Sequence, residues 1–235
     1  EIVLPSFEAN RHTRLLCILH QEMLFHLYNG MPLPNLFVYG KPWYRDAAMV
    51  AMCLQKTGNL HLIRDWVLSL AAPYDCNNAG HCEPDNLGQA LYLISTVSDA
   101  SHPLVPVILQ EANRIQKNGH LCGMSDFAPH SVYQTKWLKY GLSQLSLPDQ
   151  YKIPDISDSY DALFWWDYQD QRCPTEKFDA NTVRLYPYLG WAQAHFYRDA
   201  PPMDLLNPVY PLTWECEASQ ANYEKLNILS NSYVE

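Results

Sequence analysis

An arginine and an aspartate stand side by side at the start of an apolar stretch. Trp43 and Tyr44 precede Arg45 and Asp46, and small or apolar residues follow at 47–54. The Arg45 guanidinium offers a fork of hydrogen-bond donors beside a carboxylate acceptor, which suits the vicinal hydroxyls of a sugar. The Trp43 indole would add a flat apolar face for a pyranose ring. The alternative is structural. The helix dipole stabilises an acidic residue in the first turn, which is where Asp46 would lie, and Arg45 then pairs with Asp46.

Further carboxyl groups precede or begin other apolar segments. Hydrolysis of a glycosidic bond requires two of them across a pocket, one as general acid and one as general base. Asp126 is the candidate acid, and Glu217 or Glu215 is the candidate base. We expect Phe127 and Trp137 to bury Asp126, as a general acid requires. The structural alternatives are a cap or turn for Asp126 and first-turn positions for the two glutamates.

A rival acidic set lies farther along the chain. Asp158 and Asp161 are three residues apart and would share a helical face, and Asp167 follows the pair Trp165-Trp166. The structural alternative for this set is an N-cap followed by an aromatic core helix. Asp161 and Asp167 replace Asp126 as candidate acids if the two glutamates prove to lie far from it.

Apolar residues recur with helical spacing along most of the chain, whereas convincing strand alternation is absent. The segments 8–28, 60–71 and 102–117 each show one apolar face, while 44–57 is apolar all round and is expected to be enclosed on all sides. An alternation of outer and inner helices explains this pattern, and the N-terminal ends of the inner helices would gather at one pocket. The sequence thus predicts one all-α domain over residues 1–235. The expected helices are 8–28, 44–57, 60–71, a segment after Pro84-Asp85, 102–117, 131–146, 158–169, 182–199 and 215–229.

The composition limits the possible partners. A net charge of −9 over 235 residues argues against nucleic acid and against anionic membranes, both of which require a basic surface. A neutral glycan remains compatible with that charge. The longest strongly apolar run, 47–54, is too short to span a bilayer, and no signal peptide is visible. We therefore expect no membrane association and a cytoplasmic location, with secretion left open; the oligomeric state is not predicted.

The seven cysteines include no Cys-x-x-Cys pair. Cys76 and Cys82 flank a polar loop that also contains His81, an arrangement compatible with a disulfide or a metal cluster. The spacing matches no common zinc pattern, and reduced thiols are the expectation for a cytoplasmic protein. The sequence predicts no metal and no other cofactor.

Four segments together resemble the glucoamylase-like branch of the six-hairpin glycosidases, which are (α/α) toroids. Residues 43–48 are similar to the family's aromatic-x-Arg-Asp helix start, and residues 83–91 to its Asp-x-x-Gly-x-x-Leu helix start. Residues 125–137 resemble a third inner-helix start, and 211–218 fall where the last catalytic carboxylate is expected. The resemblance implies a toroid of helical hairpins, short or incomplete at this chain length. It also implies a glycoside hydrolase that cleaves a neutral oligosaccharide and is exo-acting and inverting.

The resemblance assigns roles to individual residues. Asp126 would protonate the leaving oxygen, and Glu217 or Glu215 would activate water. Arg45 and Asp46 would hold the sugar at the non-reducing end. The full set of implied substrate-binding residues is Trp43, Arg45, Asp46, Glu83, Asp85, His130, Tyr133 and Trp214.

Two other function classes remain open. The same toroid supports sugar isomerisation, epimerisation or lyase chemistry, in which His130, Tyr133 and His81 would serve as proton carriers. A non-catalytic carbohydrate-binding protein is the other alternative, and its main support is an aspartate, Asp126, where the family has a glutamate.

Overall fold

The computed structural model describes residues 1–10, 13–36, 39–76, 80–180, 183 and 187–199. These residues are mostly helical, in agreement with the predicted class. Contacts divide the chain into two compact units, Glu1–Ile153 and Pro154–Glu235, where the sequence predicted one domain. Each unit is described separately below.

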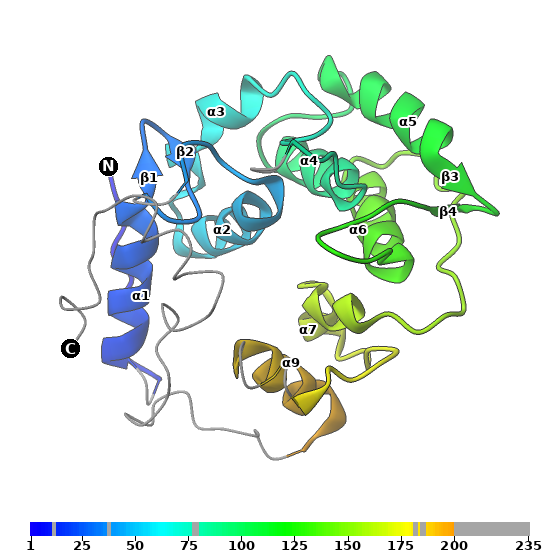
Figure 1. Cartoon of the computed structure of the whole chain (residues 1–235). Coiled ribbons are helices and arrows are strands. Elements are labelled where there is room, and N and C mark those ends of the chain that lie inside the picture. The colour runs from blue at the N-terminus through cyan, green and yellow to red at the C-terminus, as the bar shows by residue number, and fades with distance from the viewer. Residues whose placement is uncertain (11–12, 37–38, 77–79, 181–182, 184–186, 200–235) are drawn as a thin grey trace. The chain divides into compact units, whose positions relative to one another are not determined.

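The first unit alternates outer and inner helices (Figure 1). The outer helices are α1 (Thr13–Phe25), α3 (Arg64–Leu68) and α5 (Leu104–Ile115). The inner helices are α2 (Tyr44–Thr57), α4 (Asp85–Val97) and α6 (Ser131–Gln144). A 3-10 turn, η1 (Leu60–Leu62), leads into α3, so the expected helix 60–71 is shorter and broken.

Two short β-hairpins interrupt the helical pattern. β1 (Leu27–Tyr28) pairs with β2 (Met31–Pro32), and β3 (Gln116–Lys117) pairs with β4 (His120–Leu121). Each hairpin turns at an Asn-Gly dipeptide whose two residues both have positive φ, as a type I′ turn requires. The ends of the predicted helices 8–28 and 102–117 are therefore wrong, because their last residues are strands.

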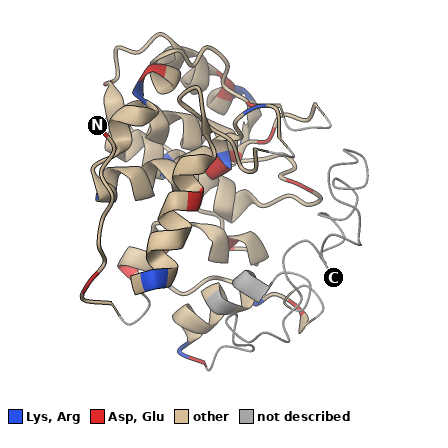
Figure 2. Ribbon diagram, turned by 90° about the vertical axis from the view of Figure 1, so that its left-hand side faces the viewer, with Lys and Arg blue, Asp and Glu red and all other residues tan. Residues whose placement is uncertain are grey.

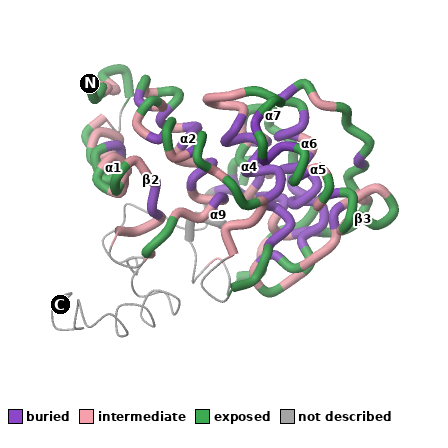
Figure 3. The backbone as a smooth tube through the Cα atoms, turned by 90° about the horizontal axis from the view of Figure 1, so that it is seen from above, coloured by how far each residue is buried: buried purple, intermediate pink, exposed green. Residues whose placement is uncertain are grey.

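The helix that is enclosed on all sides is α4, not α2. Every residue from Asp85 to Ile94 is buried, whereas α2 leaves Gln55 and Lys56 exposed. Figure 3 shows the continuous buried stretch in α4 and α6. The prediction for α2 was wrong because its buried residues, Ala47 and Ala51 among them, lie on one face of the helix.

Glycines bring α4 and α6 into close contact. A Cβ added to Gly88 on α4 would lie 2.1 Å from the Trp137 backbone carbonyl carbon, and one added to Gly141 would lie 2.6 Å from the Gly88 oxygen. Trp137 and Tyr140 on α6 then pack against Tyr92 on α4, with the two tyrosine rings stacked at 5.3 Å. The close packing fixes where the N-terminal ends of both helices lie.

The second unit contains shorter helical segments. These are the 3-10 turn η2 (Ser159–Leu163), α7 (Asp167–Asp170) and α9 (Pro187–Tyr197), so the predicted helix 158–169 is broken in two. Asp158 accepts a hydrogen bond from the Tyr160 amide at 3.0 Å, which is the N-cap alternative considered above. The predicted helix 215–229 lies outside the described residues.

Charged positions are scattered along the described ribbon, with blue and red residues interspersed (Figure 2). No helix among the described residues is long and apolar enough to cross a membrane.

The contact at Gly88 leads to a stability prediction. Gly88→Ala forces α4 and α6 apart, because the added methyl group meets backbone rather than a movable side chain, and we expect the free energy of unfolding to fall by about 3 kcal/mol. Urea unfolding measures the change. Gly40→Ala is the matched control, since a Cβ there has no neighbour within 4 Å. Equal stability of the two variants would contradict the packing described here.

Candidate functional site

The Arg45 guanidinium joins three carboxylates at the N-terminal ends of the inner helices. Its Nη2 donates to Glu83 Oε2 at 2.7 Å, its Nη1 to Asp126 Oδ2 at 2.8 Å, and its Nε to Asp85 Oδ2 at 3.2 Å. Arg45 lies in the first turn of α2, Asp85 begins α4, and Asp126 lies in the loop before α6. The helix starts that the sequence predicted to converge are thus brought together around one cation.

Other polar groups hold these carboxylates in place. Asp85 is fully buried and also accepts hydrogen bonds from the Ser125 hydroxyl and, at 2.8 Å, from Gln89 Nε2. Glu83 Oε1 accepts a hydrogen bond from the backbone amide of Asp126 at 2.9 Å. Asp126 has a positive φ of 53°, which turns its loop back toward α4. We call Arg45, Glu83, Asp85 and Asp126 the Arg45 cluster.

The carboxylates of the cluster differ in access to solvent. The exposed fraction of the side chain is 5% for Glu83, 0% for Asp85 and 25% for Asp126. Burial raises the pKa of Glu83, and Arg45 opposes that shift. Despite its own desolvation, Arg45 has a raised pKa, because Asp85, Asp126 and Glu83 surround it. Asp126 is therefore the member of the cluster that a ligand can most readily touch.

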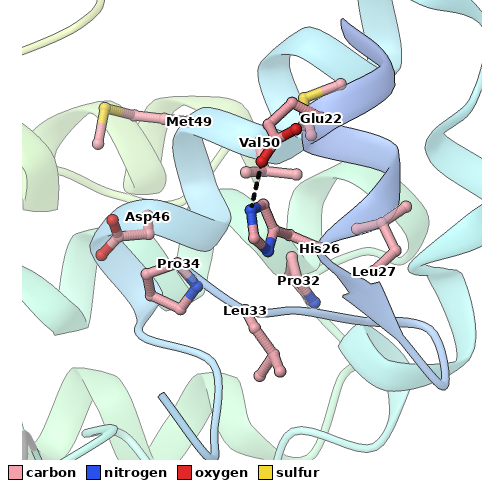
Figure 4. Close-up of a pocket in the computed structure, with 10 residues that line it drawn as sticks. Glu22, His26, Leu27, Pro32, Leu33, Pro34, Asp46, Met49 and Val50 are labelled. Atoms are coloured by element: carbon pink, nitrogen blue, oxygen red, sulfur yellow. Dashed lines mark hydrogen bonds and ion pairs between the residues drawn. The ribbon is translucent and has the colours of Figure 1, made fainter. Parts of the chain in front are cut away.

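Asp46 lines a pocket of about 330 Å³ (Figure 4). It faces the pocket from α2, while the hydrogen-bonded pair Glu22 and His26, at 3.2 Å, faces it from the end of α1 and the residue that follows. Burial raises the pKa of Asp46, although Arg45 beside it acts in the opposite direction. The remaining walls are largely apolar and consist of Met23, Leu27, Pro32, Leu33, Pro34, Met49 and Val50.

A second carboxyl group stands at the start of α2. Asp75 Oδ2 accepts a hydrogen bond from the backbone amide of Tyr44 at 2.6 Å. The backbone amide of Asp75 itself donates a hydrogen bond to Asn86 Oδ1 at 3.2 Å. Asp75 thereby connects the first turns of α2 and α4. Burial raises the pKa of Asp75 to about 6, partly offset by the hydrogen bond from Tyr44.

The remaining predicted site residues fall into three groups. Trp43 packs edge-on against Tyr39 at 5.0 Å, and its buried indole N–H has no partner among the described residues. His130 and Tyr133 are 7% and 1% exposed. Outside the described residues lie Trp214, Glu215 and Glu217.

One expectation for Asp126 was wrong. Phe127 is 96% exposed and does not bury the neighbouring carboxylate, whereas Trp137 is 1% exposed in the contact between α4 and α6. The loop turns at Asp126 and directs Phe127 outward. Asp126 is partly exposed and is held by its ion pair with Arg45 at 2.8 Å.

The rival acids are engaged in local structure. Asp161 Oδ2 accepts a hydrogen bond from the backbone amide of Thr175 at 3.0 Å, and Asp167 forms an ion pair with Arg172 at 2.7 Å. Among the described residues, no group of three or more His, Cys, Asp or Glu side chains is arranged to hold a metal ion.

Sequence reasoning missed Asp75, Gln89, Glu22 and the pocket role of His26. Gln89 had a detectable signal, since it lies four residues after Asp85 and so shares its helical face. The i,i+4 spacing of Glu22 and His26 was likewise a local signal for their pairing, but not for the pocket, which tertiary packing forms. Asp75 had no local signal, because it contacts the start of α2, 31 residues away.

No family model matches the chain, and no curated protein or solved structure shows significant similarity to it.

Geometry as well as charge is required at Arg45. We expect Arg45→Lys to lower the free energy of unfolding by on the order of 2 kcal/mol, because carboxylates placed around three separate guanidinium nitrogens cannot all come within hydrogen-bond distance of one ammonium nitrogen. Chemical denaturation measures the effect. In the control Arg64→Lys, the guanidinium is 55% exposed and 3.9 Å from Asp65, so little change is expected. A harmless Arg45→Lys would show that the cluster needs only a positive charge.

Asp75 makes stability depend on pH. Its pKa rises from 3.8 to about 6 on folding, so the folded state binds the proton more tightly and stability is lost as pH rises through that window. In Asp75→Asn the side chain keeps an oxygen that accepts the hydrogen bond from Tyr44 but no longer titrates, so the variant does not lose this stability as pH rises. Relative to wild type, we expect the variant to gain on the order of 2 kcal/mol between pH 4 and pH 7.

The difference between the two unfolding curves, recorded at each pH, isolates the contribution of Asp75. Asp99 supplies a control of opposite sign, because hydrogen bonds from Ser101 lower its pKa. Asp99→Asn should therefore lose stability relative to wild type as pH rises. A flat difference curve for Asp75→Asn would mean that Asp75 titrates alike in both states.

Proposed function

We propose that the chain is built on an (α/α) toroid and acts as a glycoside hydrolase on a neutral oligosaccharide, exo-acting and inverting. In this proposal Asp126 is the general acid, and Glu217 or Glu215 is the general base. Asp46 and the residues around the Arg45 cluster bind the terminal sugar. The three pairs of outer and inner helices in the described part of the first unit support the toroid.

The accessible carboxyl group of Asp126 is the observation that supports the proposal most. It stands where the N-terminal ends of α2 and α4 meet the loop before α6, and it is the most exposed of the three carboxylates bound to Arg45. A catalytic acid must reach the substrate while a fixed scaffold positions it. Arg45 and the Asp126 backbone bond to Glu83 provide that scaffold.

The charge of the site suits the reaction. With Asp126 protonated as the general acid, Glu83 and Asp85 still outnumber the single Arg45 guanidinium, and Asp46 adds a further acidic group nearby. Cleavage of a glycosidic bond passes through a transition state with oxocarbenium character, and an excess of negative charge stabilises that positive charge. The same excess disfavours anionic substrates, which supports a neutral sugar.

The pocket beside Asp46 offers the groups that a sugar needs. Asp46 supplies acceptor oxygens for hydroxyl groups, and Met49, Pro34 and Val50 supply apolar surface for the C–H faces of a ring. The isomerase, epimerase or lyase alternative depends on His130, Tyr133 and His81. His130 and Tyr133 are largely buried, and only His81 is exposed. The accessible carboxyl groups therefore favour hydrolysis over that alternative.

Hydrolysis of a panel of neutral disaccharides tests the proposal. We expect Asp126→Asn and Glu217→Gln each to reduce kcat by roughly 10²–10⁴-fold, since each removes one proton-transfer group. Asp46→Asn should mainly raise KM, because it removes a charged acceptor for substrate hydroxyls. Release of new reducing ends, measured for each variant, provides the readout.

Asp65→Asn is the matched control, because Asp65 is fully exposed and lies on outer helix α3. Glu215→Gln distinguishes the two candidate bases. If Glu217→Gln and Glu215→Gln both keep wild-type activity, neither glutamate is the base. Binding of sugars by calorimetry without turnover would instead favour the non-catalytic carbohydrate-binding protein.

A further inference from the structure

Two thiols meet at the loop that precedes α4. The sulfur atoms of Cys76 and Cys82 are 3.3 Å apart, and the two residues are six positions apart in the chain. Cys82 is exposed and Cys76 is half-buried, so a small reagent can reach the pair. The sequence left a disulfide and a metal cluster open for this loop, and the geometry favours sulfur chemistry.

The other described cysteines have different surroundings. The thiols of Cys17, Cys122 and Cys173 donate to main-chain carbonyls of Pro5, His120 and Phe196, respectively. Cys53 lies on α2, where burial raises the pKa of its thiol. The contact between Cys76 and Cys82 is thus a local feature of this loop.

Both ends of the loop are attached to the functional site. Asp75, next to Cys76, accepts the first amide of α2, and Lys41 Nζ donates to the Asp75 carbonyl at 2.6 Å. Glu83, next to Cys82, binds Arg45. A covalent bond between the two sulfurs would therefore restrain the backbone next to Asp75, which contacts the start of α2, and next to Glu83, which binds Arg45.

We propose that Cys76 and Cys82 form a reversible dithiol–disulfide pair that closes this loop and holds the starts of α2 and α4 together. The proposal stands on the contact between the two thiols and does not depend on the reaction that the site catalyses. The partner reagent is a low-molecular-weight disulfide of the glutathione class.

The exchange proceeds in two balanced steps. The thiolate of exposed Cys82 attacks one sulfur of glutathione disulfide, forming a mixed disulfide and releasing glutathione thiolate. The Cys76 thiolate then attacks the Cys82 sulfur and releases the second glutathione. The two protons lost by the cysteines go to the two glutathione thiolates, so two thiols and one disulfide give one disulfide and two thiols. Burial and the hydrogen bond to Cys76 raise the pKa of Cys82, so the first step accelerates as pH rises.

Equilibration of the full chain with defined ratios of reduced to oxidised glutathione tests the pair. After alkylation of free thiols, peptide mapping by mass spectrometry should find a Cys76–Cys82 link that disappears at high reduced glutathione. Cys76→Ser and Cys82→Ser should each abolish the link, while Cys53→Ser should leave it intact. The thermal unfolding midpoint of wild type should rise on oxidation, and that of Cys82→Ser should not.

Several results would overturn the proposal. These are separate glutathione adducts on Cys76 and Cys82 without a link between them, or a link from either residue to another cysteine. Equal unfolding midpoints for oxidised and reduced wild type would show that the link closes the loop without holding the helix starts. Because the mass measurement needs no sugar, failure here is distinguishable from failure of the proposed hydrolase activity.

Discussion

The Arg45 guanidinium is the interaction on which the rest of the first unit depends. Glu83 and Asp85 come from the start of α4 and Asp126 comes from the loop before α6, and mutual repulsion would separate the three carboxylates without a cation between them. Arg45 bonds to each of them through a different nitrogen, so its planar fork sets direction as well as charge. The starts of α2 and α4 and the loop before α6 are thereby fixed in one place.

Close helix packing makes that arrangement rigid. Gly88 follows Asp85 by three residues, so the position that lets α6 approach α4 lies one turn from the ion pair with Arg45. Gln134 on α6 donates to the Ser125 hydroxyl, which in turn bonds to Asp85. Backbone contact and side-chain bonds thus hold the same two helices in register, and the carboxylates have little freedom to rearrange.

Most helices could be predicted because their apolar spacing is a local property. Tyr44–Thr57 was predicted to the residue, and its end follows from Gly58, which adopts the left-handed conformation. The Asn-Gly turns at 29–30 and 118–119 are also local signals, and reading them as hairpins would have corrected two helix ends. Which inner helix is enclosed could not be predicted, since burial of α4 depends on α6, 44 residues away at the contact between Gln89 and Tyr133.

The roles of the site residues could be predicted only in part from the sequence. Sequence reasoning chose Arg45 and Asp46 together to grip a sugar, but adjacent helical residues point in different directions. Arg45 therefore faces the carboxylates of the other helix starts, and Asp46 faces the pocket. A guanidinium bound to three carboxylates is held by the scaffold, so in the proposed hydrolase substrate recognition falls to groups at its edge. Among the described residues these would be Asp46 and Asp126. The different surroundings of Arg45 and Asp46 follow from the helical rotation between positions 45 and 46 rather than from either residue type.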